Sequence, residues 1–170
     1  LEPVLFDVFT KLTKNFYISK PPFKKIPFDE CVAKYGNDKP DLRNPLLLSD
    51  VTEMFKNSSF KLFADSINKG SIVIAIPAPN TKDQPRTFFD KLNSWAKSED
   101  QGGMGYVQFV NNEGKGPIAN NLDKDRLKKF LEIDGMNGNS SIFFLCGKAD
   151  EIMEFAAIAR MKIGNELKLI

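Results

Sequence analysis

The spacing of apolar residues predicts a helix at each end of the chain. Near the start, apolar residues recur every three or four positions over residues 2–13, which is the period of one helix face. Pro3 supports this assignment, because proline fits the first turn of a helix. The same spacing over residues 150–169 predicts a long helix at the other end. The apolar positions of the first helix are Val4, Leu5, Val8, Phe9 and Leu12.

Between these two helices, the pattern predicts strands and shorter helices in turn. An alternating stretch and a β-branched stretch flank the turn signal Asn68-Lys69-Gly70, which favours a hairpin. Two further strands and four helices complete the succession. The expected strands cover residues 60–64, 71–78, 106–110 and 141–146, and the expected helices cover residues 29–34, 49–56, 81–97 and 123–133.

This succession predicts an α+β fold within one domain. We expect a two-layer domain with a mostly antiparallel sheet in the order β-β-α-β-α-β, helices on one face, and flanking helices. A length of 170 residues fits one compact domain with extensions. The natural boundaries lie near Asp41 and Lys148, which divides the chain into residues 1–40, 41–148 and 149–170.

The titratable residues limit the chemistry that the chain can perform. It has 24 Lys and Arg, 22 Asp and Glu, and no His, so imidazole catalysis and His metal ligation are excluded. A net charge of +2 leaves only local basic patches for a nucleic acid. Cys31 and Cys146 lie in apolar contexts, which favours buried free thiols over a disulfide. Free thiols in turn favour a reducing compartment.

The remaining features indicate a soluble location. No apolar run approaches the roughly 20 residues of a membrane span, and no signal pattern opens the chain. We therefore expect a cytoplasmic protein that makes no membrane contact. The chain begins at Leu1 and not at Met, so we expect it to be a piece of a longer polypeptide.

Most motifs that could indicate catalysis or ligand binding are explained better as turns or as solvated helix faces. The glycines of residues 102–105 precede a strand and not a helix, so a turn is favoured over a phosphate-binding loop. Neighbouring carboxylates point apart on a helix, and no metal-ligand spacing occurs, so we expect no catalytic pair and no metal site. Lys124 and Lys128 lie four residues apart on one expected helix; they are candidates for contact with a phosphate backbone, although a solvated face is the commoner explanation.

The loop after the second helix resists such an explanation. Residues 35–45 hold Asp38, Lys39, Asp41 and Arg43 between prolines, and Gly36 is expected to end the preceding helix. Oppositely charged groups at this density can form a fixed network that positions the neighbouring backbone. We therefore take these four residues as the leading candidates for a functional loop.

The loop sequence resembles that of a known enzyme family. Residues 35–43 read Tyr-Gly-Asn-Asp-Lys-Pro-Asp-Leu-Arg, similar to the Tyr-Gly-x-Asp-Lys-Pro-Asp-Leu-Arg signature of bacterial-type aspartyl-tRNA synthetases. The downstream order of motifs resembles the GAD insertion domain of those enzymes. The similar stretches are residues 60–63, 71–79, 102–106, the Gly-Pro-Ile-Ala of residues 116–119, and the Arg-x-Lys-x-Gly of residues 160–164. Asn120 departs from the family, where Lys is frequent.

The resemblance implies a role for the parent protein and a smaller one for this chain. The parent would be a class II ligase, a homodimer that uses ATP and Mg²⁺ to activate aspartate and transfer it to tRNA. The class motifs would lie outside these 170 residues, so the chain alone is expected to be accessory, to bind no cofactor, to bind tRNA weakly at most, and to be monomeric. Asp38, Lys39, Asp41 and Arg43 would lie beside the parent's catalytic pocket. Lys124 and Lys128 would be the candidates for contact with tRNA.

Two other functions remain open at this level. The same domain occurs in tRNA-dependent amidotransferases, so a tRNA-binding module without ligase activity is the alternative. A spacer that binds no ligand is the third possibility. The sequence leaves open whether the parent charges only the aspartate tRNA or the asparagine tRNA as well.

Overall fold

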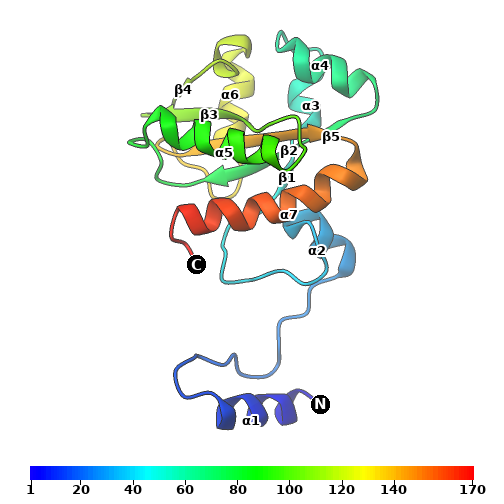
Figure 1. Cartoon of the computed structure of the whole chain (residues 1–170), viewed down its shortest axis with the longest axis vertical. Coiled ribbons are helices and arrows are strands. Elements are labelled where there is room, and N and C mark those ends of the chain that lie inside the picture. The colour runs from blue at the N-terminus through cyan, green and yellow to red at the C-terminus, as the bar shows by residue number, and fades with distance from the viewer.

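The computed structural model describes residues 1–170 and has the expected α+β class (Figure 1). Its sheet has five strands, and a short 3-10 helix at Ala119–Asn121 adds to the seven α-helices. The α-helices are α1 Glu2–Leu12, α2 Phe28–Tyr35, α3 Thr52–Phe55, α4 Lys61–Asn68, α5 Arg86–Ser98, α6 Lys124–Leu131 and α7 Ala149–Glu166. The strands are β1 Ser49–Asp50, β2 Ile72–Ala78, β3 Gly105–Val110, β4 Glu113–Lys115 and β5 Ser141–Gly147.

The sheet is antiparallel throughout, in the order β1-β2-β5-β3-β4. At its centre β2 and β5 pair along their whole length, from Ile72 opposite Gly147 to Ala78 opposite Ser141. β3 and β4 form a hairpin whose two-residue turn, Asn111 and Asn112, has positive φ at both positions, as type I′ turns require. Neither β1 nor β4 is among the strands expected from the sequence.

Helices cover both faces of the sheet, which differs from the expected single helical layer. Along β2, Ile74 and Ile76 point into one apolar cluster with α5 and α7, whereas Val73 and Ala75 point into another with α3, α4 and α6. Figure 1 shows α4 and α6 on one side of the sheet and α7 on the other. Because both central strands are buried on both faces, they read as continuous apolar runs.

The stretch predicted as the first strand is part of helix α4, so the predicted hairpin is wrong. Phe60, Phe63 and Ile67 pack against the same apolar cluster and Ala64 is buried, while Leu62 is exposed. Their spacing of three, one and three residues is helical, and it outweighs the alternation of Phe60, Leu62 and Ala64. The turn at Gly70 is present and leads from α4 directly into β2.

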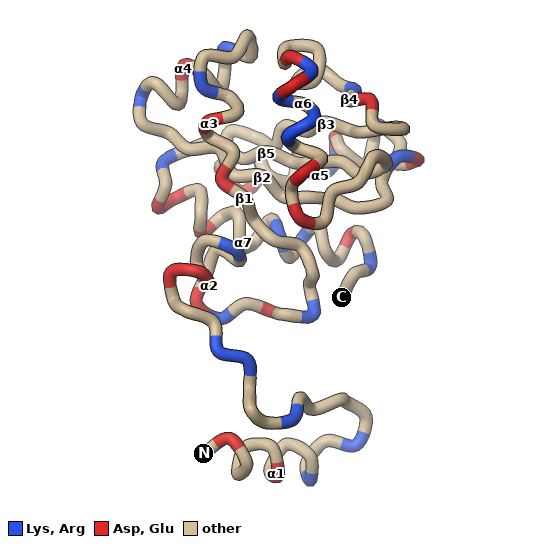
Figure 2. The backbone as a smooth tube through the Cα atoms, turned by 180° about the vertical axis from the view of Figure 1, so that it is seen from behind, with Lys and Arg blue, Asp and Glu red and all other residues tan.

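Helix α1 lies apart from the rest of the molecule (Figure 1). None of its residues is buried, and the connector over residues 13–27 has four lysines and no carboxylate. Figure 2 shows these basic positions along the extended chain between α1 and α2. The Phe23 N–H donates to Glu2 Oε2 at 3.1 Å, which links the far part of the connector back to α1. No helix in the chain combines the length and the apolar character needed to cross a bilayer.

Candidate functional site

The loop between α2 and β1 is held against α7 by Arg160. This arginine is 1% exposed, although it carries a charge. Its Nε donates to the carbonyl of Leu46, and its Nη2 donates to the carbonyls of Asn44 and Asp41, the latter at 3.1 Å. The fixed fork of a guanidinium suits such a set of carbonyls, which a lysine could not satisfy at once. Arg160 therefore fixes the course of the loop over three of its residues.

Asn44 completes this contact from the side of the loop. Its side chain is buried, its Nδ2 donates to the carbonyl of Arg160 at 2.9 Å, and its Oδ1 accepts from the Leu46 N–H at 3.0 Å. Gly164 makes room for it, because a Cβ there would lie 2.5 Å from Asn44 Nδ2. We call Arg160 and Asn44, with the carbonyls that they bind, the loop anchor.

The guanidinium of the loop anchor has a further partner in Tyr35, the last residue of α2. The Arg160 Cζ lies 5.0 Å from the centroid of the Tyr35 ring, a distance typical of cation–π contact. Burial lowers the pKa of Arg160 from its ordinary value, while Tyr35 and Asp41 act in the opposite direction. A buried charge requires this many partners, since removing one leaves an uncompensated charge in the interior.

α2 also approaches α7 closely at its own end. Gly36 ends α2 with φ of 82°, the left-handed conformation that the sequence predicted for this position. A Cβ on Gly36 would lie 2.8 Å from both Ala157 Cβ and the carbonyl oxygen of Met153. Glycine is therefore needed here twice, for the backbone conformation and for the space.

Two of the four predicted loop residues form a well-defined ion pair. Arg43 Nε lies 3.0 and 3.1 Å from the two carboxylate oxygens of Asp41, and the Arg43 N–H also donates to Asp41 Oδ1 at 3.0 Å. These hydrogen bonds lower the pKa of Asp41 to about 2. The Arg43 side chain is 76% exposed, so its guanidinium can still reach a partner outside the chain.

The other two residues form a separate, looser contact. Lys39 Nζ lies 3.8 Å from Asp38 Oδ2, and both side chains are largely exposed. The structure therefore joins Asp41 to the loop anchor through its carbonyl, and it leaves Asp38 and Lys39 in solvent. The predicted single charge network is two separate pairs. The position of these four residues beside a catalytic pocket stays a prediction.

Lys124 and Lys128 lie far from this loop in the fold. Both are exposed on α6, which packs on the opposite face of the sheet from α7. Asp123 caps this helix, with Oδ1 accepting from the Arg126 N–H at 2.8 Å. Figure 2 shows acidic residues among the basic ones of α6. Contact of Lys124 and Lys128 with tRNA stays a prediction.

The remaining candidate groups add little chemistry. Cys31 and Cys146 are free thiols, as favoured from the sequence, and burial raises the pKa of the Cys146 thiol. No group of three or more Cys, Asp or Glu side chains lies close enough together to hold a metal ion. The loop and its anchor are thus arranged to position backbone and to present charge.

Sequence reasoning placed Arg160 in a family motif but missed its role, and it missed Asn44. The signal was present, because Arg160 is the one charge in the stretch of residues 155–161, which otherwise consists of apolar residues. A charged residue on the apolar face of a helix must find partners on the element packed against it. The identity of that element follows only from the tertiary fold.

Taken together, the fold and the loop anchor define an α+β domain tied to a flanking segment by one buried arginine. The model of the GAD domain family matches residues 63–156, which is more than half of the chain. The chain belongs to this family. The match includes most of α4, the sheet from β2 to β5, and the first eight residues of α7.

Three curated relatives match the chain along its whole length. The chain is 47% identical to the "Aspartate--tRNA(Asp/Asn) ligase" of Gluconobacter oxydans (strain 621H), 46% identical to that of Paramagnetospirillum magneticum (strain ATCC 700264 / AMB-1) and 48% identical to that of Acidiphilium cryptum (strain JF-5). It spans 29%, 19% and 29% of these relatives' lengths, respectively. The matches extend beyond the GAD domain to α1, α2 and the anchored loop, and they confirm the resemblance seen in the sequence.

Proposed function

We propose that this chain is the insertion-domain region of an aspartate–tRNA ligase, together with segments that flank the insertion. The observation that carries the proposal is the 46–48% identity over the whole chain, including the residues before the GAD match. A domain reused in an unrelated protein would be similar over residues 63–156 and would diverge outside them. The relatives' names favour a ligase over the amidotransferase module.

The parent's reaction follows from this assignment. It activates aspartate with ATP, with Mg²⁺ on the phosphates, and transfers it to tRNA in the cytoplasm as a homodimer. Positioning and charge stabilisation by Arg side chains and metal ions carry such chemistry. The 170 residues contribute no catalytic group to it and act as an accessory part.

Within the parent, residues 1–40 and 149–170 belong to the catalytic domain and residues 41–148 to the insertion. The apolar side chains that α1 exposes support this division, because they find no partner within the chain. Val4, Val8 and Phe9 are 61%, 44% and 52% exposed. A further 71% of the length of a relative such as that of Gluconobacter oxydans lies outside the matched region and is available to cover them.

The anchored loop connects the two parts in this proposal. Arg160, on the helix that returns from the insertion, binds the carbonyls of the loop that leads into it. The position of the insertion is thereby transmitted to Asp41 and Arg43. The loop anchor thus keeps the exposed guanidinium of Arg43 in a fixed place beside the catalytic domain.

Aminoacylation by the full-length parent tests the proposal. We expect it to charge aspartate tRNA with aspartate, and we expect the 170-residue chain alone to give no aspartate-dependent ATP–pyrophosphate exchange. In the full-length protein, Arg43→Ala should lower kcat/KM for aminoacylation at least tenfold. Lys61→Ala, which removes an exposed cation on α4, is the control and should leave it unchanged.

Three results would contradict the proposal. Exchange activity of the isolated chain would show that catalytic groups lie within it. A full-length parent that modifies an already charged tRNA would show the amidotransferase function instead. Unchanged kinetics of Arg43→Ala would support a spacer and remove the role given to the loop.

A further inference from the structure

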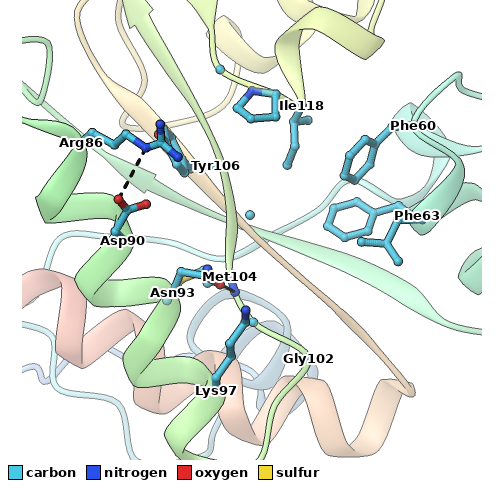
Figure 3. Close-up of a pocket in the computed structure, with 15 residues that line it drawn as sticks. Phe60, Phe63, Arg86, Asp90, Asn93, Lys97, Gly102, Met104, Tyr106 and Ile118 are labelled. Carbon is cyan, nitrogen blue, oxygen red and sulfur yellow. Dashed lines mark hydrogen bonds and ion pairs between the residues drawn. The ribbon is translucent and has the colours of Figure 1, made fainter.

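A cavity of about 540 Å³ opens at the edge of the sheet, away from the anchored loop (Figure 3). One wall is α5 from one helical layer, and the opposite wall is α4 from the other. Between them lie Gly105 and Tyr106, the first residues of β3, which pair with β5 but not with β4. This volume falls in the range of small-molecule sites in proteins, about 300–1,000 Å³. The chain thus has a formed pocket to which neither the anchored loop nor the basic face of α6 contributes.

The α5 wall is polar, because four polar side chains lie on the same face of the helix. Arg86, Asp90, Asn93 and Lys97 follow one another at intervals of four, three and four residues, which places them on one face of the helix. Arg86 Nε and Asp90 Oδ2 lie 3.5 Å apart and balance each other's charge. Lys97 forms no ion pair, so it supplies the net positive charge of this wall. An anionic group is the expected partner of Lys97.

Asn93 presents a hydrogen-bond donor with a fixed direction. Its Oδ1 accepts from the backbone N–H of Met104 at 2.9 Å, which determines how the amide is turned. The Nδ2 group points away from that bond and makes no hydrogen bond of its own, and Asn93 lies between Asp90 and Lys97 in Figure 3. The wall therefore offers a donor, a carboxylate acceptor and a cation in a row.

The opposite wall is apolar and aromatic. Phe60 and Phe63 pack edge to face with their ring centroids 4.9 Å apart, and Ile118 lies next to them (Figure 3). Phe63 is itself held by Phe55 at 5.0 Å, so the wall is rigid. Flat π-systems stack favourably on such rings. Gly103 leaves room for the polar wall, since a Cβ there would lie 2.6 Å from Asn93 Oδ1 and 3.2 Å from Lys97 Cε.

We propose that this pocket binds one unpaired nucleotide of an RNA strand. The base lies against Phe60 and Phe63, the polar edge of the base faces Asp90 and Asn93, and the phosphate lies at Lys97. A ligand that combines a flat apolar body, a hydrogen-bonding edge and an anion satisfies both walls at once. The choice of RNA over a free nucleotide rests on the proposed function, in which the parent acts on tRNA.

Binding measured on the 170-residue chain by NMR tests the inference. A single-stranded RNA trinucleotide should shift the amide resonances of Asn93, Lys97 and Gly102 through Tyr106. Asn93→Asp keeps the acceptor for Met104 and removes the donor, so affinity should fall about tenfold or more. Lys97→Ala should reduce the slope of log affinity against log salt by about 0.7, the contribution of one phosphate contact to a single strand.

Lys91→Ala is the matched control, because Lys91 is an exposed lysine on α5 that does not line the cavity. It should change neither the affinity nor the salt slope by as much as Lys97→Ala. If adenosine 5′-monophosphate binds as tightly as the trinucleotide, the ligand is a free nucleotide and the proposal of an RNA strand is wrong. Shifts confined to α6, or duplex RNA that binds equally well, would overturn the pocket. These readouts do not involve aminoacylation, so failure here is distinguishable from failure of the proposed function.

Discussion

At the scale of single residues, Arg160 is the charged group that holds the loop between α2 and β1 against α7. It is buried, it donates to three backbone carbonyls of one loop, and its own carbonyl accepts from Asn44 in return. A buried charge adds little net stability compared with a well-packed apolar residue, but removing it leaves its partners unsatisfied. We infer that the main effect of Arg160 is to select the conformation of this loop.

Replacing this guanidinium tests that role. Arg160→Lys keeps the charge but cannot reach all three carbonyls, so the free energy of unfolding should fall by about 2–4 kcal/mol. Lys162→Met is the control on the same helix, because its exposed pair with Glu166 at 2.9 Å should be worth less than about 1 kcal/mol. Urea unfolding of both variants measures the difference. Equal losses would show that Arg160 does not organise the loop.

The pH dependence of stability should contain a contribution from Asp41. Its pKa in the folded state is lowered to about 2, chiefly by hydrogen bonds from Arg43. A lowered pKa stabilises the folded state above the ordinary value of 3.8, and the stabilisation is lost as the pH falls toward 2. The stability difference between the unmodified chain and Asp41→Asn should therefore shrink between pH 6 and pH 2.5.

Urea unfolding at several pH values gives this difference directly. Asp38→Asn serves as the comparison, because the 3.8 Å contact of Asp38 with Lys39 is exposed. It should change stability by less than about 1 kcal/mol at pH 6. A stability difference for Asp41→Asn that stays constant down to pH 2.5 would disprove the assigned role of its carboxylate.

At the scale of elements, the sequence predicted the elements with a clear hydrophobic pattern better than those without one. β2, β3, β5, α1, α2 and α7 lie close to their predicted positions, because each has a long apolar run or a clear period. α5 begins at Arg86 and not at Thr81, because the Thr81 hydroxyl binds the Ala78 carbonyl and Ser141 Oγ in place of capping a helix. β4 is polar and three residues long, so its pairing with β3 is the only thing that defines it.

The candidate site was predictable to a similar extent. The loop with Asp41 and Arg43 could be found from its dense charge and its prolines, since both are local features. Its anchor joins residues about 116 positions apart, Asn44 and Arg160, and no local pattern contains such a pair. The cavity likewise depends on α4 being a helix, and the strand predicted over residues 60–64 would have removed its aromatic wall.

The packing of α2 on α7 gives a prediction at this scale. Gly36→Ala and Gly70→Ala both place a Cβ at positive φ, which costs about 1–2 kcal/mol. Only Gly36 also meets other atoms, with Ala157 Cβ at 2.8 Å, whereas Gly70 has nothing within 4 Å. Gly36→Ala should therefore destabilise the chain by at least about 1 kcal/mol more than Gly70→Ala. Chemical denaturation of the two variants checks this. Equal losses of unfolding free energy would show that the close approach of α2 to α7 does not require glycine at position 36.

At the scale of the whole molecule, the chain consists of a packed body and an attached helix. The body has apolar clusters on both faces of the sheet, and α2 and the anchored loop pack onto it through α7. α1 shares in neither cluster. We propose that the exposed apolar face of α1 binds a surface on the rest of the parent, of which the chain spans only a part.

Hydrogen exchange distinguishes the body from the attached helix. An isolated helix of 11 residues is only marginally stable in water, so the amides of Glu2–Leu12 should exchange with little protection. The amides of β2 and β5 should be protected to nearly the full free energy of unfolding. Deleting residues 1–27 should change the unfolding free energy of the body by less than about 1 kcal/mol, because α1 buries no residue in it.

In the full-length parent, the amides of Glu2–Leu12 should become protected, since the apolar face of α1 is then covered. Strong protection of α1 in the 170-residue chain at low concentration would show instead that the helix docks on the body, and it would remove the surface assigned to the parent.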